Sequence, residues 1–535
     1  MSATVSLILD GFKGSIGAVE PAAAPYDRPA ERVSLTMTFL CVGIGAAILL
    51  MFGREARTEE ADMTPARALR SVVEVEEEVY RFTPAKNGAD PMWCLGSTTL
   101  VRIGEDVFAS GLETLKAVPP LNNVRWTLWK RSDKGWQLEQ ADEKHRTREP
   151  CPLACFHDGR LFMSANPTRI QGRKAGGGPA RPEVLRFDAA DPKATFKTLR
   201  PGWRGRPRFT EHSYRSFAAD GPNGEMILFQ NIGYTHSAWA FRDRTGRWAA
   251  AGELKWLREP DPSEAPYGRA GIRVNYPNVC LRGRAVHFCG ASAFDRWERM
   301  PDVGDTHRKW GLRFRRLYYT WTPDVTKRAF SAWLELASTH KTGGWCFPGD
   351  LWVDAQGAAH VAWMEAPINK ALRDQRFPDT KRTCALKYAI IRDGRVEHRA
   401  TLAAGGEGAG GEGAGGKGAA SEWPGAPDLT DGRFGRVGSS LGQPRLHATP
   451  DGRLFALYYV AGKDPTGKPV SENRMIELRG RQRPGRPVRL PLKCPLCNFF
   501  TATPRAGSAA SDVIDLLGRR PGVWQTLCYA RIRLR

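Results

Sequence analysis

Apolar and polar positions alternate in a pattern that repeats from residue 93 to the end of the chain. Each repeat holds an apolar strand, a tight polar turn, a second apolar strand, and a third strand that ends in another turn. The pattern is clearest at four places: residues 155–164 (CFHDGRLFMS), 279–289 (VCLRGRAVHFC), 351–363 (LWVDAQGAAHVAW) and 446–459 (LHATPDGRLFALYY). In the first of these, Asp158, Gly159 and Arg160 supply the positive φ of a hairpin turn, so we expect a β-hairpin there and at its counterparts.

The hairpins belong to larger units that recur along the chain. A third strand is expected after each of them, at residues 182–187, 316–322, 385–392 and 474–479. Weaker copies begin near Ser97, His212 and Phe499, which gives about seven units of roughly 60 residues. Such a unit cannot bury its own apolar face, so several must stack or close in a ring. With 17 Trp, 56 Gly, 38 Pro and no long helical period in the body, we predict an all-β propeller of about seven four-stranded blades, with six as the alternative.

The last unit holds three strands, because the chain stops after residues 528–534 (CYARIRL). Residues 72–80 (VVEVEEEVY), upstream of the first unit, alternate in part between apolar and charged positions. We predict that this segment supplies the missing outer strand and closes the ring, since closure leaves only short, protected edges. A short helix that links a membrane segment to the propeller is the alternative.

Before the repeats, residues 33–52 (VSLTMTFLCVGIGAAILLMF) carry no charge and lie between Arg32 and Arg54. A run of about twenty apolar residues is long enough to span a bilayer. We expect a single-pass transmembrane helix or signal anchor that tethers the propeller to the cytoplasmic membrane, facing the periplasm or exterior; a cleaved signal peptide and secretion are the alternative. The expected divisions are a disordered N-terminus, the span, a stalk and the propeller: residues 1–31, 32–54, 55–71 and 72–535.

The chain is strongly basic. Lys and Arg number 79 against 57 Asp and Glu, a formal net charge of +22 that is spread through the body. Such an excess attracts anionic partners. The apolar N-terminal segment and the lack of a nucleic-acid-binding motif argue against nucleic acid. We expect an acidic polysaccharide or glycan as the partner, and a generally Arg-rich solvated surface is the alternative.

The eleven cysteines show no spacing that identifies a metal site. The only close pairs are Cys151 with Cys155 and Cys494 with Cys497, and a lone CxxC is weak evidence for zinc. We expect structural thiols or an occasional disulfide, no metal and no cofactor. Residues 403–420 (AAGGEGAGGEGAGGKGAA) are expected to form a flexible Gly-rich loop.

Polar residues gather where the innermost strands are expected to begin. Those strands surround the central channel of a propeller, so their first residues point toward a shared mouth. The set is Arg148, Glu149, Glu211, His212, Tyr214, Arg215, Arg273, Asn275, Tyr276, Asn278, Asp350, Gln443, Arg445, Thr503 and Arg505, with His236 at the end of a neighbouring strand. We predict a site there, because packing alone does not call for so many His, Tyr and Arg side chains. The alternatives are a hydrogen-bonded core histidine and packing tyrosines.

Together with the hairpin pattern, residues 212–217 (HSYRSF), 276–279 (YPNV) and 316–324 (RLYYTWTPD) resemble the BNR-repeat, sialidase-like propeller proteins. They are similar also to the propeller polysaccharide lyases related to ulvan lyase, and the resemblance covers residues 90–535. The Asp-box of the first family, S-x-D-x-G-x-x-W, is only approximated at residues 133–136 (DKGW) and 243–248 (DRTGRW). This departure argues against a true sialidase.

A lyase of this kind removes a proton beside the carboxylate of a uronic acid. Its site therefore needs a base that titrates near neutral pH, and cations or amides that neutralise the carboxylate. The resemblance implies that His212 is the base and Tyr214 the acid or a partner base. It implies three residues at the substrate carboxylate: Arg148, Arg215 and Asn275.

A sialidase-like glycoside hydrolase is the second hypothesis. It would use Tyr214 or Tyr276 as the nucleophile, oriented by Glu149, and Asp350 is the nearest candidate for its acid. Its arginine cluster would come from Arg148, Arg215, Arg445 and Arg505. A non-catalytic propeller that binds glycans or proteins is the third hypothesis, since a fold does not imply a function.

Overall fold

The structure is a computed structural model. It describes residues 70–170, 177–258, 271–292, 314–339, 342, 344–367, 373–374, 377–406, 441–463 and 469–535. All of these belong to one compact unit, Arg67–Arg535. The expected N-terminus, membrane span and stalk up to residue 69 lie outside the described residues. Within the described residues, no helix is long and apolar enough to cross a membrane.

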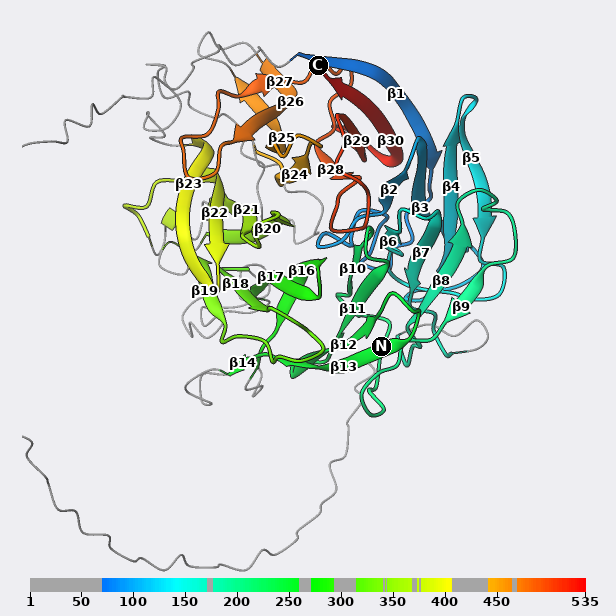
Figure 1. The fold of residues 1–535 in the computed structure, drawn as a ribbon. Helices are drawn as coiled ribbons and strands as arrows, with labels where there is room; N and C mark the ends of the chain where they lie inside the picture. Colours follow the sequence, from blue (N-terminus) through cyan, green and yellow to red (C-terminus); the bar gives the residue numbers. More distant parts are fainter. Residues whose placement is uncertain are drawn as a thin grey trace, which may run out of the picture. The chain divides into compact units, whose positions relative to one another are not determined.

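Seven four-stranded antiparallel sheets are arranged around a ring, with one strand of each sheet nearest the centre (Figure 1). From the inner strand outward, blade 1 is β2 (Leu100–Ile103), β3 (Asp106–Thr114), β4 (Val124–Ser132) and β5 (Gly135–Ala141). Blade 2 is β6 (Leu153–Cys155), β7 (Arg160–Ala165), β8 (Glu183–Asp188) and β9 (Lys197–Leu199). Blade 3 is β10 (Ser216–Asp220), β11 (Glu225–Ile232), β12 (His236–Arg242) and β13 (Trp248–Lys255).

The remaining blades follow the same order. Blade 4 is β16 (Val274–Arg282), β17 (Ala285–Ser292), β18 (Arg316–Thr322) and β19 (Leu334–Ser338). Blade 5 is β20 (Trp345–Val353), β21 (Ala359–Ala366), β22 (Thr383–Arg392) and β23 (Arg395–Gly406). Blade 6 is β24 (Arg445–Ala448), β25 (Leu454–Lys463), β26 (Pro469–Leu478) and β27 (Val488–Arg489). Blade 7 is β28 (Asn498–Thr501), β29 (Val513–Arg520), β30 (Val523–Leu534) and β1 (Ser71–Arg81). A separate pair, β14 (Leu257–Arg258) and β15 (Gly271–Ile272), precedes blade 4.

Each blade is apolar on both faces because it packs between two neighbours. In blade 3, Phe217 and Leu228 pack in one cluster with Phe162 of blade 2. The residues that alternate with them, such as Phe229, pack with Phe288 of blade 4. The apolar repeat therefore fills the spaces between blades, and the prediction of seven four-stranded blades is confirmed. The six-bladed alternative is wrong.

The ring closes through the segment upstream of the first repeat. Strand β1 pairs antiparallel with β30, from Ser71 opposite Leu534 to Arg81 opposite Thr526. Main-chain bonds between Arg70 and Arg535 extend this pairing by one residue. The prediction that residues 72–80 complete the last blade is confirmed, and the helical alternative is wrong.

A buried ion pair reinforces the seam between blades 1 and 7. Arg102 of β2 donates to both carboxylate oxygens of Asp515 of β29, from Nε at 2.6 Å and from Nη2 at 2.7 Å. The Tyr529 hydroxyl also donates to Asp515. Arg102 is 7% exposed and Asp515 1%, and their other ion pairs, Arg102 with Glu105 and Asp515 with Arg531, are longer, at 3.7 Å each.

Two segments cross the centre of the ring. The first, residues 93–98, accepts bonds from Arg445 of blade 6, which donates to the Leu95 carbonyl (3.0 Å), and from Arg505 of the second segment, which donates to the Gly96 carbonyl (2.8 Å). The second, residues 502–508, carries carbonyls that accept from the main chains of blades 2 and 3. A Cβ on Gly96 would lie 2.3 Å from the Pro277 carbonyl oxygen, so the first segment requires glycine there. Protein thus bridges the channel that the repeats alone would leave open.

The described residues cover part of the predicted Gly-rich loop and most of the cysteines. Residues 403–406, expected in the flexible loop, instead finish β23, and residues 407–420 lie outside the described part. Ten cysteines lie among the described residues, including Cys151, Cys155, Cys494 and Cys497, and none of the ten forms a disulfide.

We predict that Arg102→Met lowers the free energy of unfolding by about 3–5 kcal/mol, because it leaves the Asp515 carboxylate buried without its partner. Urea denaturation of the two proteins measures the difference. Arg81→Met is the control, since Arg81 pairs with Glu78 at a side-chain exposure of 77% and should change stability by less than about 1 kcal/mol. Equal effects of the two substitutions would contradict this account of the seam.

Candidate functional site

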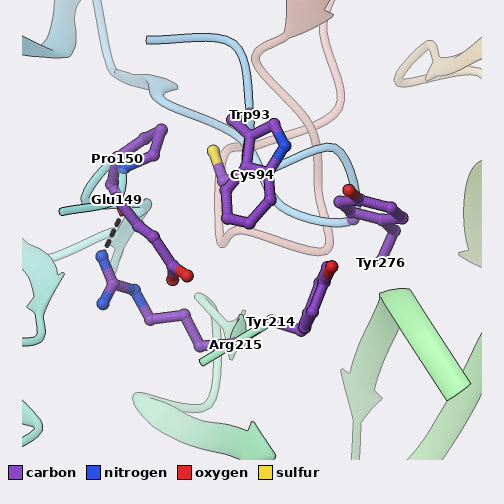
Figure 2. Close-up of a pocket in the computed structure, with 8 residues that line it drawn as sticks. Trp93, Cys94, Glu149, Pro150, Tyr214, Arg215 and Tyr276 are labelled. Atoms are coloured by element: carbon purple, nitrogen blue, oxygen red, sulfur yellow. Dashed lines mark hydrogen bonds between the residues drawn. The ribbon is translucent and has the colours of Figure 1, made fainter. Parts of the chain in front are cut away.

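Polar and aromatic side chains from blades 2, 3 and 4 surround a small cavity beside the segment 93–98. Figure 2 shows its lining, which comprises Trp93, Cys94, Gly96, Glu149, Pro150, Tyr214, Arg215 and Tyr276. Glu149 precedes β6, Tyr214 and Arg215 precede β10, and Tyr276 lies within β16. The cavity volume is about 10 Å³, room for about one water molecule. Any ligand larger than a water molecule would therefore bind over this cluster rather than inside the cavity.

Glu149 is a buried carboxylate with three neighbours that favour its charge. It accepts from the Ser213 main-chain N–H (3.0 Å) and the Ser213 hydroxyl (2.6 Å), and His212 Nδ1 lies 3.4 Å from its Oε1. Burial alone would raise the pKa of Glu149, but His212, the Arg215 charge and Ser213 outweigh it and hold the pKa below the usual value. Glu149 is therefore an anion within ion-pair distance of His212, whose buried Nδ1 has no hydrogen-bond partner among the described residues.

His212 remains accessible on its other side. Its side chain is 27% exposed, and no described residue hydrogen-bonds its Nε2. Its ring lies 4.4 Å from the Tyr214 ring and 5.2 Å from the Trp93 ring, centroid to centroid. A buried carboxylate behind a partly exposed imidazole leaves the outer nitrogen free to accept a proton from a bound molecule.

Two tyrosines in the cluster have an uncommon backbone conformation. Tyr214 has φ of 40° and Tyr276 has φ of 50°, a region that costs a bulky residue about 1–3 kcal/mol. Tyr276 lies where β16 bulges away from β17, between Asn275 and Asn278. The two rings meet edge to face at 5.0 Å. The fold therefore holds both phenols in strained positions, as is typical of functional sites.

Burial sets the protonation of the two phenols. It raises the pKa of Tyr214, against the lowering effect of Arg273, and it raises the pKa of Tyr276 well above the usual value, with Tyr214 adding to the rise. Both hydroxyls therefore stay protonated at neutral pH. A protonated phenol can donate a proton, whereas it is a poor nucleophile.

Arg273 adds a cation beside the tyrosines. Its guanidinium carbon lies 4.6 Å from the centre of the Tyr214 ring and 4.3 Å from that of Tyr234. Its side chain is buried, and no described residue hydrogen-bonds its Nε. Arg273 was one of the polar residues noted in the sequence, but no role was assigned to it.

The other residues proposed as carboxylate ligands face protein groups. Arg148 donates to the Asn87 carbonyl (3.0 Å) and lies 3.5 Å from Glu211. Arg215 is buried and donates to the Pro150 carbonyl, the dashed line in Figure 2. Asn275 is buried in β16 and does not line the cavity. Of these three, Arg215 alone lines the cavity, where its charge supports the ionised Glu149.

Three predicted site residues lie elsewhere. His236 begins β12 and bonds to Thr235 (2.8 Å), with Glu253 at 3.8 Å. Arg445 and Arg505 are buried at the centre of the ring, where Arg505 pairs with Asp350 at 2.6 Å. Arg445 and Arg505 do not line the cavity, because the segment 93–98 occupies the centre and accepts bonds from both. His236 does not line it either.

Trp93 and Ser213 belong to the site but were not identified from the sequence. Trp93 lies in the segment that crosses the centre, outside the repeated pattern, so strand periodicity gives no signal for it. Ser213 lies between His212 and Tyr214, and only its bonds to Glu149 reveal its role. Among the described residues, no group of three or more His, Cys, Asp or Glu side chains is placed to hold a metal ion.

Comparisons with known proteins identify no family. No family model matches the chain, and no curated protein matches it. The chain is similar to the solved structure of polysaccharide lyase Uly1, with 9% identity and a TM-score of 0.42 over 87% of this chain and 99% of that one. It is similar also to a protein of unknown function from Dyadobacter fermentans (11%, 0.40, over 88% and 100%) and to an α-L-arabinanase from Penicillium chrysogenum (8%, 0.37, over 86% and 98%). At such low identity, function must be argued from the site itself.

We predict that Ser213→Ala lowers the free energy of unfolding by about 1–3 kcal/mol at neutral pH, because the buried Glu149 carboxylate loses one donor. The lost donor also raises the pKa of Glu149. Because the pKa of Glu149 is lower in the native state than in the unfolded state, its charge stabilises the fold at pH values above the unfolded-state pKa. This stabilisation is lost as pH falls, so the cost of Ser213→Ala should shrink in acid. Denaturation at several pH values measures it.

Ser132→Ala is the control, since Ser132 is the last residue of β4 and donates to the Gly135 carbonyl across the turn. Its effect should stay within about 0.5 kcal/mol. A Ser213→Ala cost that is constant from neutral to acid pH would show that Ser213 does not act through the charge of Glu149.

Proposed function

We propose that the protein is a carbohydrate-active propeller that cleaves an acidic polysaccharide by β-elimination at the His212 cluster. The observation that carries this proposal is the pairing of a buried, ionised Glu149 with the partly exposed His212, beside the phenol of Tyr214. An elimination needs a base on one atom and a proton donor for the leaving group, and these two side chains supply both.

The reaction would proceed as follows. His212 Nε2 takes the proton from the carbon next to the uronate carboxylate, and the electron pair of that C–H bond forms a double bond within the sugar ring. The bond to the glycosidic oxygen breaks, and that oxygen takes a proton from the Tyr214 hydroxyl. The phenol carries its proton at neutral pH, because its pKa lies above the ordinary value.

The substrate carboxylate would meet Arg273. The Arg273 guanidinium lies over the rings of both Tyr214 and Tyr234. Its positive charge would offset the negative charge that develops when the carbon next to the carboxylate loses its proton. The basic composition of the chain, with a formal net charge of +22, would attract the polymer as a whole.

A sialidase-like hydrolysis fits the cluster less well. It needs an ionised tyrosine and several arginines around one carboxylate, but burial raises the pKa values of Tyr214 and Tyr276. Arg445 and Arg505 donate to main-chain carbonyls at the centre of the ring. A propeller that binds glycans without cleaving them remains an outcome of the test below.

We predict that the purified protein releases unsaturated products, detected by their ultraviolet absorbance, from at least one of a panel of acidic polysaccharides. His212→Ala and Tyr214→Phe should each lower kcat/KM by about 10²-fold or more, the range for loss of a general base or acid. His145→Ala is the control, since His145 is 45% exposed and contacts Asp142. Release of reducing sugar without ultraviolet absorbance would indicate hydrolysis, binding without cleavage would indicate a lectin, and full activity of His212→Ala would refute the assigned base.

The proposal places this propeller outside the cytoplasmic membrane, tethered by residues 32–54. The uncharged run of residues 33–52 supports this placement. We predict that the full-length protein stays in the membrane pellet after alkaline carbonate washing, and that replacing Leu40 and Ile44 with Arg releases it, because each charge at mid-span costs about 3 kcal/mol. A protein in the medium that lacks these residues would show secretion instead of a tether.

A further inference from the structure

A larger cavity lies at the opposite end of the inner strands from the His212 cluster. It lies beside the turn that joins β6 to β7 and the turn that joins β10 to β11, and its volume is about 340 Å³. That volume falls in the lower part of the range for small-molecule sites. Its lining includes His157, Asp158, Arg160, Asn223 and Arg244. Arg160 and Arg244 bring two positive charges, and Asp158 brings one negative charge.

A buried arginine near this cavity has no counter-ion. Arg242, the last residue of β12, is 8% exposed, and no described residue forms an ion pair or a side-chain hydrogen bond with it. Its Nη1 is fully buried without a hydrogen-bond partner. Proteins rarely bury an unpaired guanidinium, since the lost hydration costs several kcal/mol.

The surroundings of Arg242 add positive charge. Burial and the neighbouring charges of Arg160 and Arg186 lower the pKa of Arg242. Arg186 lies on β8 directly opposite Lys197 on β9, a like-charge pair that is unfavourable without an anion between or near the two.

The acidic groups nearby already have partners. Asp158 lines the cavity itself, where it pairs with Arg160 at 2.6 Å and is 53% exposed. Asp243 accepts three bonds within its own turn, from Thr245 and Arg247. Asp220 accepts from Asn223 and from the main chain of Gly283. The described acids therefore leave Arg186, Arg242 and Arg244 without a paired carboxylate.

We propose that this cavity between blades 2 and 3 binds a tetrahedral oxyanion, the sulfate or phosphate group of a small ligand. Arg244 lines the cavity without a paired carboxylate and would bond the anion directly. Arg160, also in the lining, pairs with Asp158 and would add charge, as would the neighbouring Arg242 and Arg186. A doubly charged anion suits a group of several guanidinium side chains, which bind such oxygens through paired N–H donors. The cavity is separate from the proposed reaction, so either assignment can fail without the other.

The test measures binding to the full-length protein by isothermal titration calorimetry at constant ionic strength. Inorganic sulfate and inorganic phosphate are the first probes, and a monosaccharide sulfate and a monosaccharide phosphate are the second. We expect saturable binding of the inorganic ions in the millimolar range. Tighter binding of the sugar sulfate or of the sugar phosphate would identify which ester the site takes.

Two substitutions and a matched control locate the site. Arg244→Gln and Arg242→Leu should each weaken binding about tenfold. Arg247→Gln removes the same charge from the same exposed turn, where Arg247 does not line the cavity, so it should change the affinity by less than about twofold. Arg242→Leu replaces an unpaired buried charge with an apolar group, a change that is often neutral or stabilising. If that variant fails to fold, the exposed Arg244 carries the test alone.

Some results would overturn the proposal. Equal weakening by Arg244→Gln and Arg247→Gln would show that the anions respond only to net surface charge. Heats that never saturate, or wild-type affinity in Arg244→Gln, would show that the cavity does not bind an oxyanion. Proposed lyase activity should persist in Arg244→Gln, since the substitution lies at the other end of the inner strands.

Discussion

Circular closure is the constraint on which the rest of the structure depends. A blade with two apolar faces must have a neighbour on each side, and in a seven-membered ring the first and last blades can satisfy this only by meeting each other. The chain achieves this by pairing β1 with β30 and by burying the Arg102–Asp515 pair in the same seam. Because the first segment of the domain completes the last blade, separation of the ends would require both pairings to break together.

Closure also decides where chemistry can take place. The starts of successive inner strands are brought side by side, so that Glu149, Tyr214 and Tyr276, which come from three blades, line one cavity. His212 lies beside Glu149. The fold accepts two tyrosines in the left-handed region there. Strain of this kind persists only where surrounding packing is strong. The turns that follow the inner strands, β6 to β7 and β10 to β11, lie at the opposite end of those strands, beside the second cavity.

The fold was predictable from the sequence because its signal is local and repeated. Alternating apolar positions and turn residues such as Gly159 mark each hairpin, and a last unit of three strands requires a partner such as residues 72–80. The site was only partly predictable. The segment that holds Trp93 and Gly96 belongs to no repeat, yet it fills the centre and takes up Arg445 and Arg505. In the repeat pattern, Arg445, Arg505 and His212 all lie near inner strands, so the sequence predicts the same location for them. Only the tertiary contacts distinguish the arginines at the centre from His212.

Hydrogen exchange measured by mass spectrometry tests closure most directly. If β1 is the outer strand of the last blade, the amides of residues 71–81 should be protected and should become exchangeable together with those of β30 as denaturant is added. Exchange of residues 71–81 within seconds, while β28, β29 and β30 stay protected, would contradict the ring described here and the placement of its sites.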